Sequence, residues 1–269
     1  MTEISTNQFE YVEGQMRPSH AALLDRFIGD SERAVAQGHP ALDLAYGPHP
    51  RQTLDLFRAA GTRKGVVAFF HAGYWQSRDK SQFRFIAPPL ASDGFDVALV
   101  NYPLCPEVTV ADIVAAAAAS LAAIAARTDG VPQILVGHSA GAHIAVELAT
   151  KPPVGAWISG IVPISGVFEL EPLIDTTLNA KLGLDRASAR ACSPLGRAKP
   201  GAPRALFAVG ALETQAFRDQ TSAMANAWSE AGNEARQVTV AGADHFSVLE
   251  ELCRDEGVLR TAMSNSAWM

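Results

Sequence analysis

The sequence GHSAG at residues 137–141 carries the residue types of an acyl-transfer nucleophile. It matches G-x-S-x-G, in which a serine lies on a sharp turn between a strand and a helix. The aliphatic run at 134–136 precedes it and an alanine-rich segment follows. Both glycine positions exclude side chains, because a Cβ there would collide with neighbouring strands or with the start of the helix. A capping serine in a small-residue turn is the alternative, and the strand–turn–helix context favours Ser139 as the nucleophile.

A serine hydroxyl is a weak nucleophile at neutral pH, so it needs a base, and the base needs an orienting acid. His245 is the only histidine beyond the helix that follows the elbow, in a Gly-containing loop after the last expected strand. Glu213 is the first carboxylate after the expected strand at 204–209. Asp219 falls within the next helix, and Asp244 adjoins His245 too closely to face it. We therefore predict Glu213 as the acid, against the alternative of a solvated loop carboxylate.

Acyl transfer also requires donors for the oxyanion of the tetrahedral intermediate. The sequence HAGYW at 71–75 ends an early strand, where loops of the HGGG type supply backbone N–H groups. We predict an oxyanion hole formed by the N–H groups of Gly73, Tyr74 and Ala140. The alternative is a turn whose aromatic residues pack on the core. His71 is expected to order this loop by hydrogen bonding.

The elements that must position these groups alternate along the chain. A helix is expected at 19–37 with Ser19 as N-cap, and a half-buried strand at 52–59. Short apolar runs then alternate with helix-like segments, which predicts an α/β fold with a mostly parallel central sheet and helices on both faces. The expected strands are 66–70, 96–101, 133–137, 158–164, 204–209 and 236–240, and the expected helices are 81–92, 110–127, 140–150 and 217–231.

One domain is expected over residues 1–269, because no repeat and no Pro-, Gly- or Ser-rich linker divides the chain. Its first part, about 1–40, is expected to be helical. The segment at about 166–203 is long for a plain connection, so we predict a cap-like insertion with short helices that shapes the leaving-group pocket.

Composition excludes several classes of function. The net charge of −6 and the lack of a basic run argue against nucleic acid as a partner. The N-terminus lacks a signal-peptide pattern and no apolar run is long enough to span a bilayer, so no membrane partner and a cytoplasmic location are expected. The three cysteines of the chain form no CxxC pair. No G-x-G-x-x-G or Walker motif is present, so no cofactor is predicted. The sequence is compatible with a homodimer and does not fix the oligomeric state.

A metal site is the competing interpretation of His71, His138 and His143. The last two are five residues apart, which places them on different faces of a helix and excludes the geometry of H-E-x-x-H. We therefore predict no metal.

These motifs resemble the α/β-hydrolase superfamily from about residue 42 to 255. Within it, the chain is similar to the kynurenine formamidase (arylformamidase) and small esterase group. HAGYW resembles that group's H-G-G-x-W loop, VNYPLCPEVTVADIV (100–114) its tyrosine–proline segment, and VGALETQAFRDQ (209–220) its acid-bearing turn. Two departures stand out: Ala72 replaces a glycine and is expected to restrict the loop, and Glu213 stands where many members carry aspartate.

The resemblance implies a serine hydrolase that cleaves N-formyl-L-kynurenine, a small-molecule substrate, to kynurenine and formate. It also implies an aromatic substrate site, for which we expect His71, Trp75 and Phe168, beside Tyr74, to contact the substrate. Arg78 or Lys80 is expected to meet its carboxylate, against the alternative of a solvated cation. A carboxylesterase for small esters shares all of this machinery and remains the alternative. A hydrolase fold that only binds ligands is disfavoured, because nucleophile, base and oxyanion loop are all present.

Overall fold

The computed structural model describes residues 5–151 and 157–264. The first and last residues of the expected single domain, 1–4 and 265–269, lie outside this part of the chain, as do residues 152–156. Eight described strands form one sheet in the order β1-β2-β4-β3-β5-β6-β7-β8. Its strands are β1 Ala41–Ala45, β2 Thr53–Phe57, β3 Gly65–Phe70, β4 Phe95–Val100, β5 Gln133–His138, β6 Ile158–Ile164, β7 Arg204–Gly210 and β8 Ala235–Val240.

The sheet is mostly parallel, as predicted. Strand β2 pairs antiparallel with β1 and with β4, and every pair from β4 to β8 is parallel. The central strands are apolar on both faces because helices cover both faces. Strand β1 is not among the expected strands; it is an exposed edge strand without a buried apolar face.

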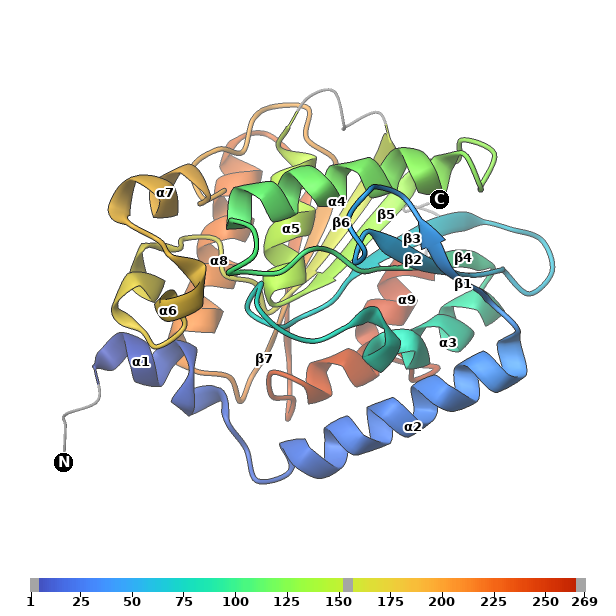
Figure 1. The fold of residues 1–269 in the computed structure, drawn as a ribbon, viewed down its shortest axis with the longest axis horizontal. Coiled ribbons are helices and arrows are strands. Elements are labelled where there is room, and N and C mark those ends of the chain that lie inside the picture. Colours follow the sequence, from blue (N-terminus) through green and yellow to red (C-terminus); the bar gives the residue numbers. More distant parts are fainter. Residues whose placement is uncertain (1–4, 152–156, 265–269) are drawn as a thin grey trace.

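Helices form layers on the two sides of the sheet (Figure 1). Helices α4, α5 and α8 lie on one side, and α2, α3 and α9 lie on the other. The α-helices are α1 Thr6–Tyr11, α2 His20–Gly38, α3 Ala87–Ser92, α4 Val110–Ala125, α5 Ala140–Ala149, α6 Asn179–Leu182, α7 Arg186–Ala191, α8 Gln215–Glu230 and α9 Val258–Ser264. The 3-10 helices are η1 Glu13–Gln15, η2 Lys80–Ile86, η4 Glu171–Asp175 and η5 Ser247–Leu252.

Each side of the sheet has its own apolar core. Trp228 of α8 and Ile113 of α4 are buried on one side. Phe27 of α2 and Leu90 of α3 are buried on the other. Burial on both faces fixes the central strands, so the loops at their carboxyl ends have rigid supports. Binding and catalytic sites of open α/β sheets form at these loops.

The segment between β6 and β7 contains the short helices η4, α6 and α7. Its residues pack against the core on the α8 side of the sheet, and Leu173 and Ala189 are fully buried there. The N-terminal segment runs beside it: Gln8 donates to Thr177 Oγ1 over 3.2 Å, and Ser5 Oγ to the carbonyl of Asp175 over 3.3 Å. Residues 5–15 therefore pack beside the segment between β6 and β7 and are not a continuation of α2.

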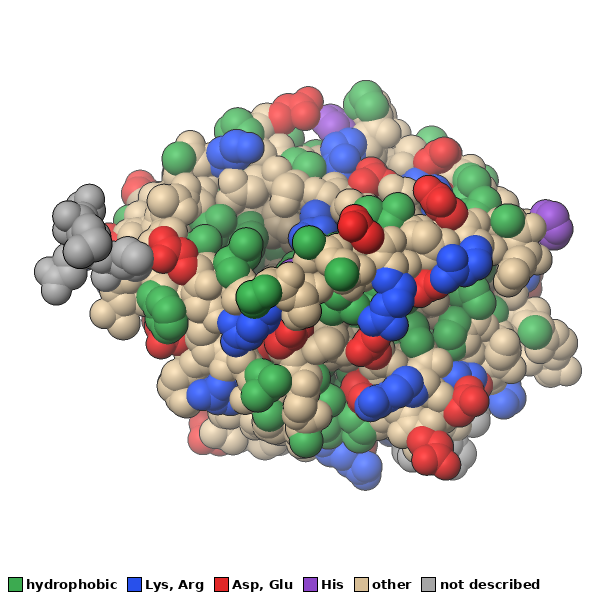
Figure 2. Space-filling view, turned by 90° about the horizontal axis from the view of Figure 1, so that it is seen from below, with side chains coloured by type: hydrophobic (Ala, Val, Ile, Leu, Met, Phe, Trp, Pro, Cys, Tyr) green, Lys and Arg blue, Asp and Glu red, His purple; other side chains and the backbone are tan. Residues whose placement is uncertain are grey.

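Among the described residues, no helix combines the length and the apolar character needed to cross a membrane. On the face seen in Figure 2, Lys and Arg side chains are interspersed with Asp and Glu side chains, and no broad field of one sign covers it. This face offers no basic stripe of the kind that binds a phosphate backbone.

Candidate active site

Ser139 lies on a strained turn between β5 and α5. Its backbone has φ 56° and ψ −116°. A residue with a side chain is strained at these angles and keeps them only where the surrounding structure holds it. Its N–H donates to the carbonyl of Ile164 over 2.8 Å, which fixes the turn to β6. A Cβ at Gly137 would lie 2.1 Å from the carbonyl oxygen of Gly141, and a Cβ at Gly141 would lie 2.0 Å from that of Phe70. The two glycines of the motif are therefore required by sterics.

Glu213 and His245 are joined in the interior. His245 Nδ1 lies 2.7 Å from Glu213 Oε2, and both side chains are buried. Because the carboxylate only accepts, Nδ1 carries the proton and Nε2 is left as the basic nitrogen. The other carboxylate oxygen, Oε1, accepts from Ser165 Oγ over 2.5 Å and from the N–H of Gly210 over 2.7 Å. Glu213 thus reaches the imidazole in spite of its extra methylene and is held by both of its oxygens.

His138 holds the loop that carries His245. Its Nε2 donates to the carbonyl oxygen of His245 over 2.6 Å. Burial, together with the nearby His245, keeps the pKa of His138 well below its usual range, so this imidazole is neutral. Phe217 of α8 packs edge-on against the His245 ring with centroids 4.8 Å apart. These contacts fix both the backbone and the ring of His245. Sequence reasoning treated His138 only as a rejected metal ligand.

The loop after β3 has an unusual run of backbone angles. Gly73, Tyr74 and Trp75 have φ values of 136°, 50° and 59°, and a Cβ at Gly73 would lie 2.1 Å from the carbonyl oxygen of Ser77. Successive positive φ values turn backbone N–H groups toward a common space, as in anion-binding nests. In the part of the chain that the structure describes, no hydrogen bond uses the N–H of Gly73, Tyr74 or Ala140. These N–H groups are therefore available to an oxyanion.

Ala72 does not restrict this loop, contrary to the expectation. It lies outside the residues with positive φ, so a glycine is not needed at that position. Its carbonyl lies 2.7 Å from His71 Nδ1, while His71 Nε2 lies 3.0 Å from Asn101 Oδ1. Tyr102 donates its hydroxyl to the carbonyl of His71 over 2.6 Å. Through Asn101 and Tyr102, which directly follow β4, His71 holds the start of the loop in the ordering role expected of it.

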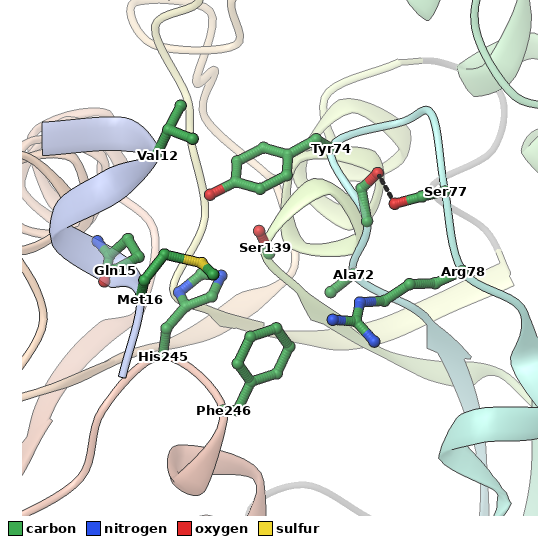
Figure 3. Close-up of a pocket in the computed structure, with 11 residues that line it drawn as sticks. Val12, Gln15, Met16, Ala72, Tyr74, Ser77, Arg78, Ser139, His245 and Phe246 are labelled. Atoms are coloured by element: carbon green, nitrogen blue, oxygen red, sulfur yellow. Dashed lines mark hydrogen bonds between the residues drawn. The ribbon is translucent and has the colours of Figure 1, made fainter. Parts of the chain in front are cut away.

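Ser139, His245 and the oxyanion loop open on one cavity of about 230 Å³ (Figure 3). The cavity is lined by Val12, Gln15, Met16, Ala72, Gly73, Tyr74, Ser77, Arg78, Ser139, His245 and Phe246. Figure 3 shows the Ser139 hydroxyl between Tyr74 above and Phe246 below, with His245 to one side. The described hydrogen bonds do not include one between Ser139 and His245. Such contacts are often loose in a free enzyme and tighten when substrate binds.

The N-terminal segment forms one wall of this cavity, which the sequence did not predict. Val12, Gln15 and Met16 line it. Gln15 Nε2 donates to Thr214 Oγ1 over 2.7 Å, and the Tyr74 hydroxyl donates to the carbonyl of Tyr11 over 2.6 Å. No motif marks residues 12–16, because apolar contact with a distant loop leaves no local pattern. Phe246 also lines the cavity, and its position next to the expected base His245 could have indicated this.

The predicted substrate-contacting residues are corrected by their burial. His71, Trp75 and Phe168 are all fully buried, and none of them lines the cavity. Trp75 packs edge-on against His143 with centroids 5.0 Å apart, and Phe168 packs edge-on against Phe207 at 6.0 Å. Their large apolar surfaces contribute to the core instead of facing a ligand. The segment at 166–203 contributes no residue to the cavity wall either, contrary to the expectation that it shapes the pocket.

The two expected cations separate clearly. Lys80 is buried, and its Nζ lies 2.6 Å from Asp43 Oδ1 and 2.9 Å from Asp55 Oδ1, so its charge is already paired. Arg78 lines the cavity. Residues 5–151 and 157–264 contain no group of three or more His, Cys, Asp or Glu side chains that could hold a metal ion.

Comparison with known proteins agrees with this fold. The alpha/beta hydrolase family matches residues 67–258, which is more than half of the chain. The chain belongs to this family and is an enzyme of the α/β-hydrolase type.

Individual relatives cover most of the chain. Kynurenine formamidase of Danio rerio is 29% identical over 87% of this chain and 83% of its own length. Kynurenine formamidase of Drosophila melanogaster is 28% identical over 91% and 89%, respectively. A solved structure from Silicibacter sp., described as a candidate thioesterase, is 33% identical with a TM-score of 0.88, covering 97% of this chain and 99% of that one. The chain is thus similar to formamidases in sequence and to a bacterial hydrolase in structure.

Proposed function

We propose that this protein is a serine hydrolase that removes the formyl group of N-formyl-L-kynurenine, giving kynurenine and formate. The observation that carries the proposal is the shared cavity, on which a serine hydroxyl, an imidazole paired with a carboxylate, and the backbone of the oxyanion loop open together. These are the parts that acyl transfer requires. Similarity to kynurenine formamidases over more than four-fifths of both chains supports the formamide as the bond cleaved.

The first half of the reaction forms an acyl-enzyme. The Ser139 hydroxyl turns toward His245 Nε2, gives it the proton and attacks the formyl carbon. The carbonyl oxygen becomes an oxyanion that accepts hydrogen bonds from the N–H groups of Tyr74 and Ala140, with Gly73 beside them. Glu213 stabilises the imidazolium through Nδ1. To complete this half, the imidazolium of His245 gives its proton to the aniline nitrogen, the C–N bond breaks, and kynurenine leaves a formyl ester on Ser139.

The second half restores the serine. Water, deprotonated by the same Nε2 of His245, attacks the formyl ester on Ser139. The C–O bond to Ser139 Oγ then breaks, Oγ takes the proton back from the imidazolium, and formate leaves. Each proton taken by His245 is returned, so the enzyme is unchanged after one turnover.

The size of the cavity supports a small acyl group. Its volume of about 230 Å³ lies below the roughly 300–1,000 Å³ of pockets that hold drug-sized ligands. Formyl is the smallest acyl group, and it leaves most of this space for the aromatic leaving group. A long acyl chain together with an aromatic leaving group would need more space than this cavity offers.

A substrate series tests the proposal. We expect efficient release of kynurenine from N-formyl-L-kynurenine, slow hydrolysis of p-nitrophenyl acetate, and much slower hydrolysis of p-nitrophenyl octanoate. Hydrolysis of the acetate without deformylation would leave the nucleophile in place and assign the protein as a carboxylesterase for small esters, the alternative with the same machinery. Serine labelling by a fluorophosphonate separates both enzymes from a protein that only binds ligands.

A further inference from the structure

Arg78 places a cation in the wall of the catalytic cavity. It follows the oxyanion loop with φ 71°, and its side chain is partly buried. The guanidinium carbon lies 4.8 Å from the centroid of the Phe246 ring. Figure 3 shows Arg78 beside Ala72, on the opposite side of Ser139 from Gln15 and Met16. The cavity therefore has a cationic end and an end formed by the N-terminal segment.

The guanidinium of Arg78 has no anionic partner among the residues that the structure describes. No carboxylate forms an ion pair with it, and it donates none of the described hydrogen bonds. Arg51, close to the same loop, shows the contrast: its side chain donates to the carbonyl oxygens of Arg78 and Tyr102 and forms an ion pair with Asp79. Among the described arginines, Arg78 thus combines partial burial and a place in the cavity with five donors that protein groups leave unused.

An unpaired cation in a partly buried site is costly to the protein. Burial lowers the pKa of the Arg78 guanidinium, which is the sign of a charged form deprived of water. The Phe246 ring offsets part of this cost through its π face. The ring does not, however, accept the N–H groups that lie in the plane of the guanidinium. These donors match the two oxygens of a carboxylate in a bidentate arrangement. The group that would satisfy both charge and geometry is an anion in the cavity.

We propose that Arg78 binds a carboxylate of the substrate, so that the enzyme selects carboxylate-bearing acyl compounds over neutral ones of the same shape. This inference rests on the proposed function in that it concerns the same cavity and the same nucleophile. It concerns the class of substrate, and it applies equally to a formamide and to an ester.

A matched pair of substrates tests the role of Arg78. The pair is N-formyl-L-kynurenine and its carboxamide, which replaces the carboxylate by a neutral group of similar size. The wild-type enzyme is expected to prefer the carboxylate by at least about tenfold in kcat/KM, as charged hydrogen bonds would give. Arg78→Gln is expected to remove most of this preference, mainly through a higher KM for the carboxylate. Arg78→Lys is expected to retain part of it, because it keeps the charge and loses the planar fork.

Arg236→Gln is the control variant. Arg236 lies on β8, is exposed, and does not line the cavity. We expect it to keep the preference of the wild type. An equal loss by Arg78→Gln on both substrates would assign Arg78 a structural role and overturn the proposal. So would a wild-type enzyme without preference, or a preference that survives in Arg78→Gln.

A second pair separates this proposal from the formamidase proposal. Phenyl acetate and 3-acetoxybenzoate are esters that differ by one carboxylate. If the enzyme hydrolyses esters but not N-formyl-L-kynurenine, the formamidase proposal fails. A preference for 3-acetoxybenzoate that Arg78→Gln removes would then still support the carboxylate role. Equal rates on the two esters, unchanged in the variant, would contradict it.

Discussion

Glu213 is a buried carboxylate with all of its contacts directed to one task. Oε1 is fixed by Ser165 Oγ and the N–H of Gly210, and Oε2 accepts from His245 Nδ1. A buried charge is tolerated when it is paired and hydrogen-bonded. Two fixed contacts on one oxygen leave the other with a single direction, toward the imidazole. The acid therefore sets both the tautomer and the orientation of His245.

Removing the charge of Glu213 tests this role. Glu213→Gln is expected to lower kcat by roughly 10³-fold to 10⁴-fold, because an amide stabilises neither the imidazolium nor the required tautomer. Glu213→Asp, which shortens the reach by one methylene, is expected to lose about 10-fold to 100-fold. Steady-state kinetics on N-formyl-L-kynurenine measures both. Asp219→Asn is the matched control and should retain full activity. A larger loss of kcat in Asp219→Asn than in Glu213→Gln would show that Glu213 is not the acid.

Ser165 is expected to act through Glu213. It is fully buried, and its Oγ donates to Oε1 over 2.5 Å. Ser165→Ala leaves one lone pair of the carboxylate without a donor, so Glu213 can turn away from His245. We predict that kcat falls by about tenfold while KM changes little. A change in KM alone, with kcat retained, would show that Ser165 does not position the acid.

At the scale of elements, the turn between β5 and α5 is the most constrained part of the site. It brings the carbonyl of Phe70 in β3 so close to Gly141 that a Cβ there would lie 2.0 Å from the oxygen. Backbone atoms of two central elements cannot both withdraw from such an overlap. The sharpness of the turn is thus determined by the packing of α5 on β3 as well as by the local sequence.

Gly141→Ala is therefore expected to destabilise the fold by about 3 kcal/mol or more, through backbone overlap in the core. The free energy of unfolding from urea titration measures the change. Gly29→Ala in α2 is the control, because its Cβ meets only the end of the Arg33 side chain at 3.6 Å. In a helix this change should be neutral or stabilising by up to about 1 kcal/mol. Equal stability of the two variants would contradict the steric requirement.

Residue types and order were enough to predict the elements that carry the site. Six of the expected strands correspond to β3 to β8. The central strands among them are buried on both faces and are therefore mostly apolar, while β8 at the edge of the sheet is half exposed. Ser139 and His245 follow from the elbow motif and from the order of elements. The approach of Glu213 to His245 was expected from the turn after β7.

Tertiary contacts explain the rest. Strand β1 has no buried face to leave a pattern, and α1 and η1 are too short to show periodicity. The aromatic residues Trp75 and Phe168 belong to the core. Burial is the common outcome for a large ring, and no sequence signal shows which ring faces a ligand. One wall of the cavity instead comes from Val12, Gln15 and Met16, which lie far from the oxyanion loop in the sequence and meet it only in the folded structure.

At the scale of the whole molecule, buried neutral histidines link stability to pH. Burial lowers the pKa of His71 and of His143 to about 4 each, and it holds that of His138 well below its usual range. Between about pH 4 and 6.5 the unfolded chain binds protons that the folded chain excludes. The free energy of unfolding therefore falls as the pH is lowered through this window.

A variant of His143 isolates one contribution. His143→Gln cannot take up a proton, so its free energy of unfolding should fall less steeply between pH 6.5 and 4, by up to about 1.4 kcal/mol per pH unit. Urea titrations at half-unit steps of pH measure the slope. His39→Asn removes an exposed histidine and serves as the control. A slope identical to that of the wild type in His143→Gln would show that His143 is not a buried neutral group.

The most direct test of the central claim is the release of kynurenine from N-formyl-L-kynurenine by the wild-type protein and by Ser139→Ala, measured side by side. Catalysis by Ser139 predicts a wild-type kcat/KM of about 10⁴ M⁻¹s⁻¹ or more. The variant, folded to the same extent, should be slower by about 10⁴-fold or more. Comparable rates in the two proteins would contradict a serine nucleophile, and a wild-type protein that hydrolyses esters but not this formamide would contradict the formamidase assignment.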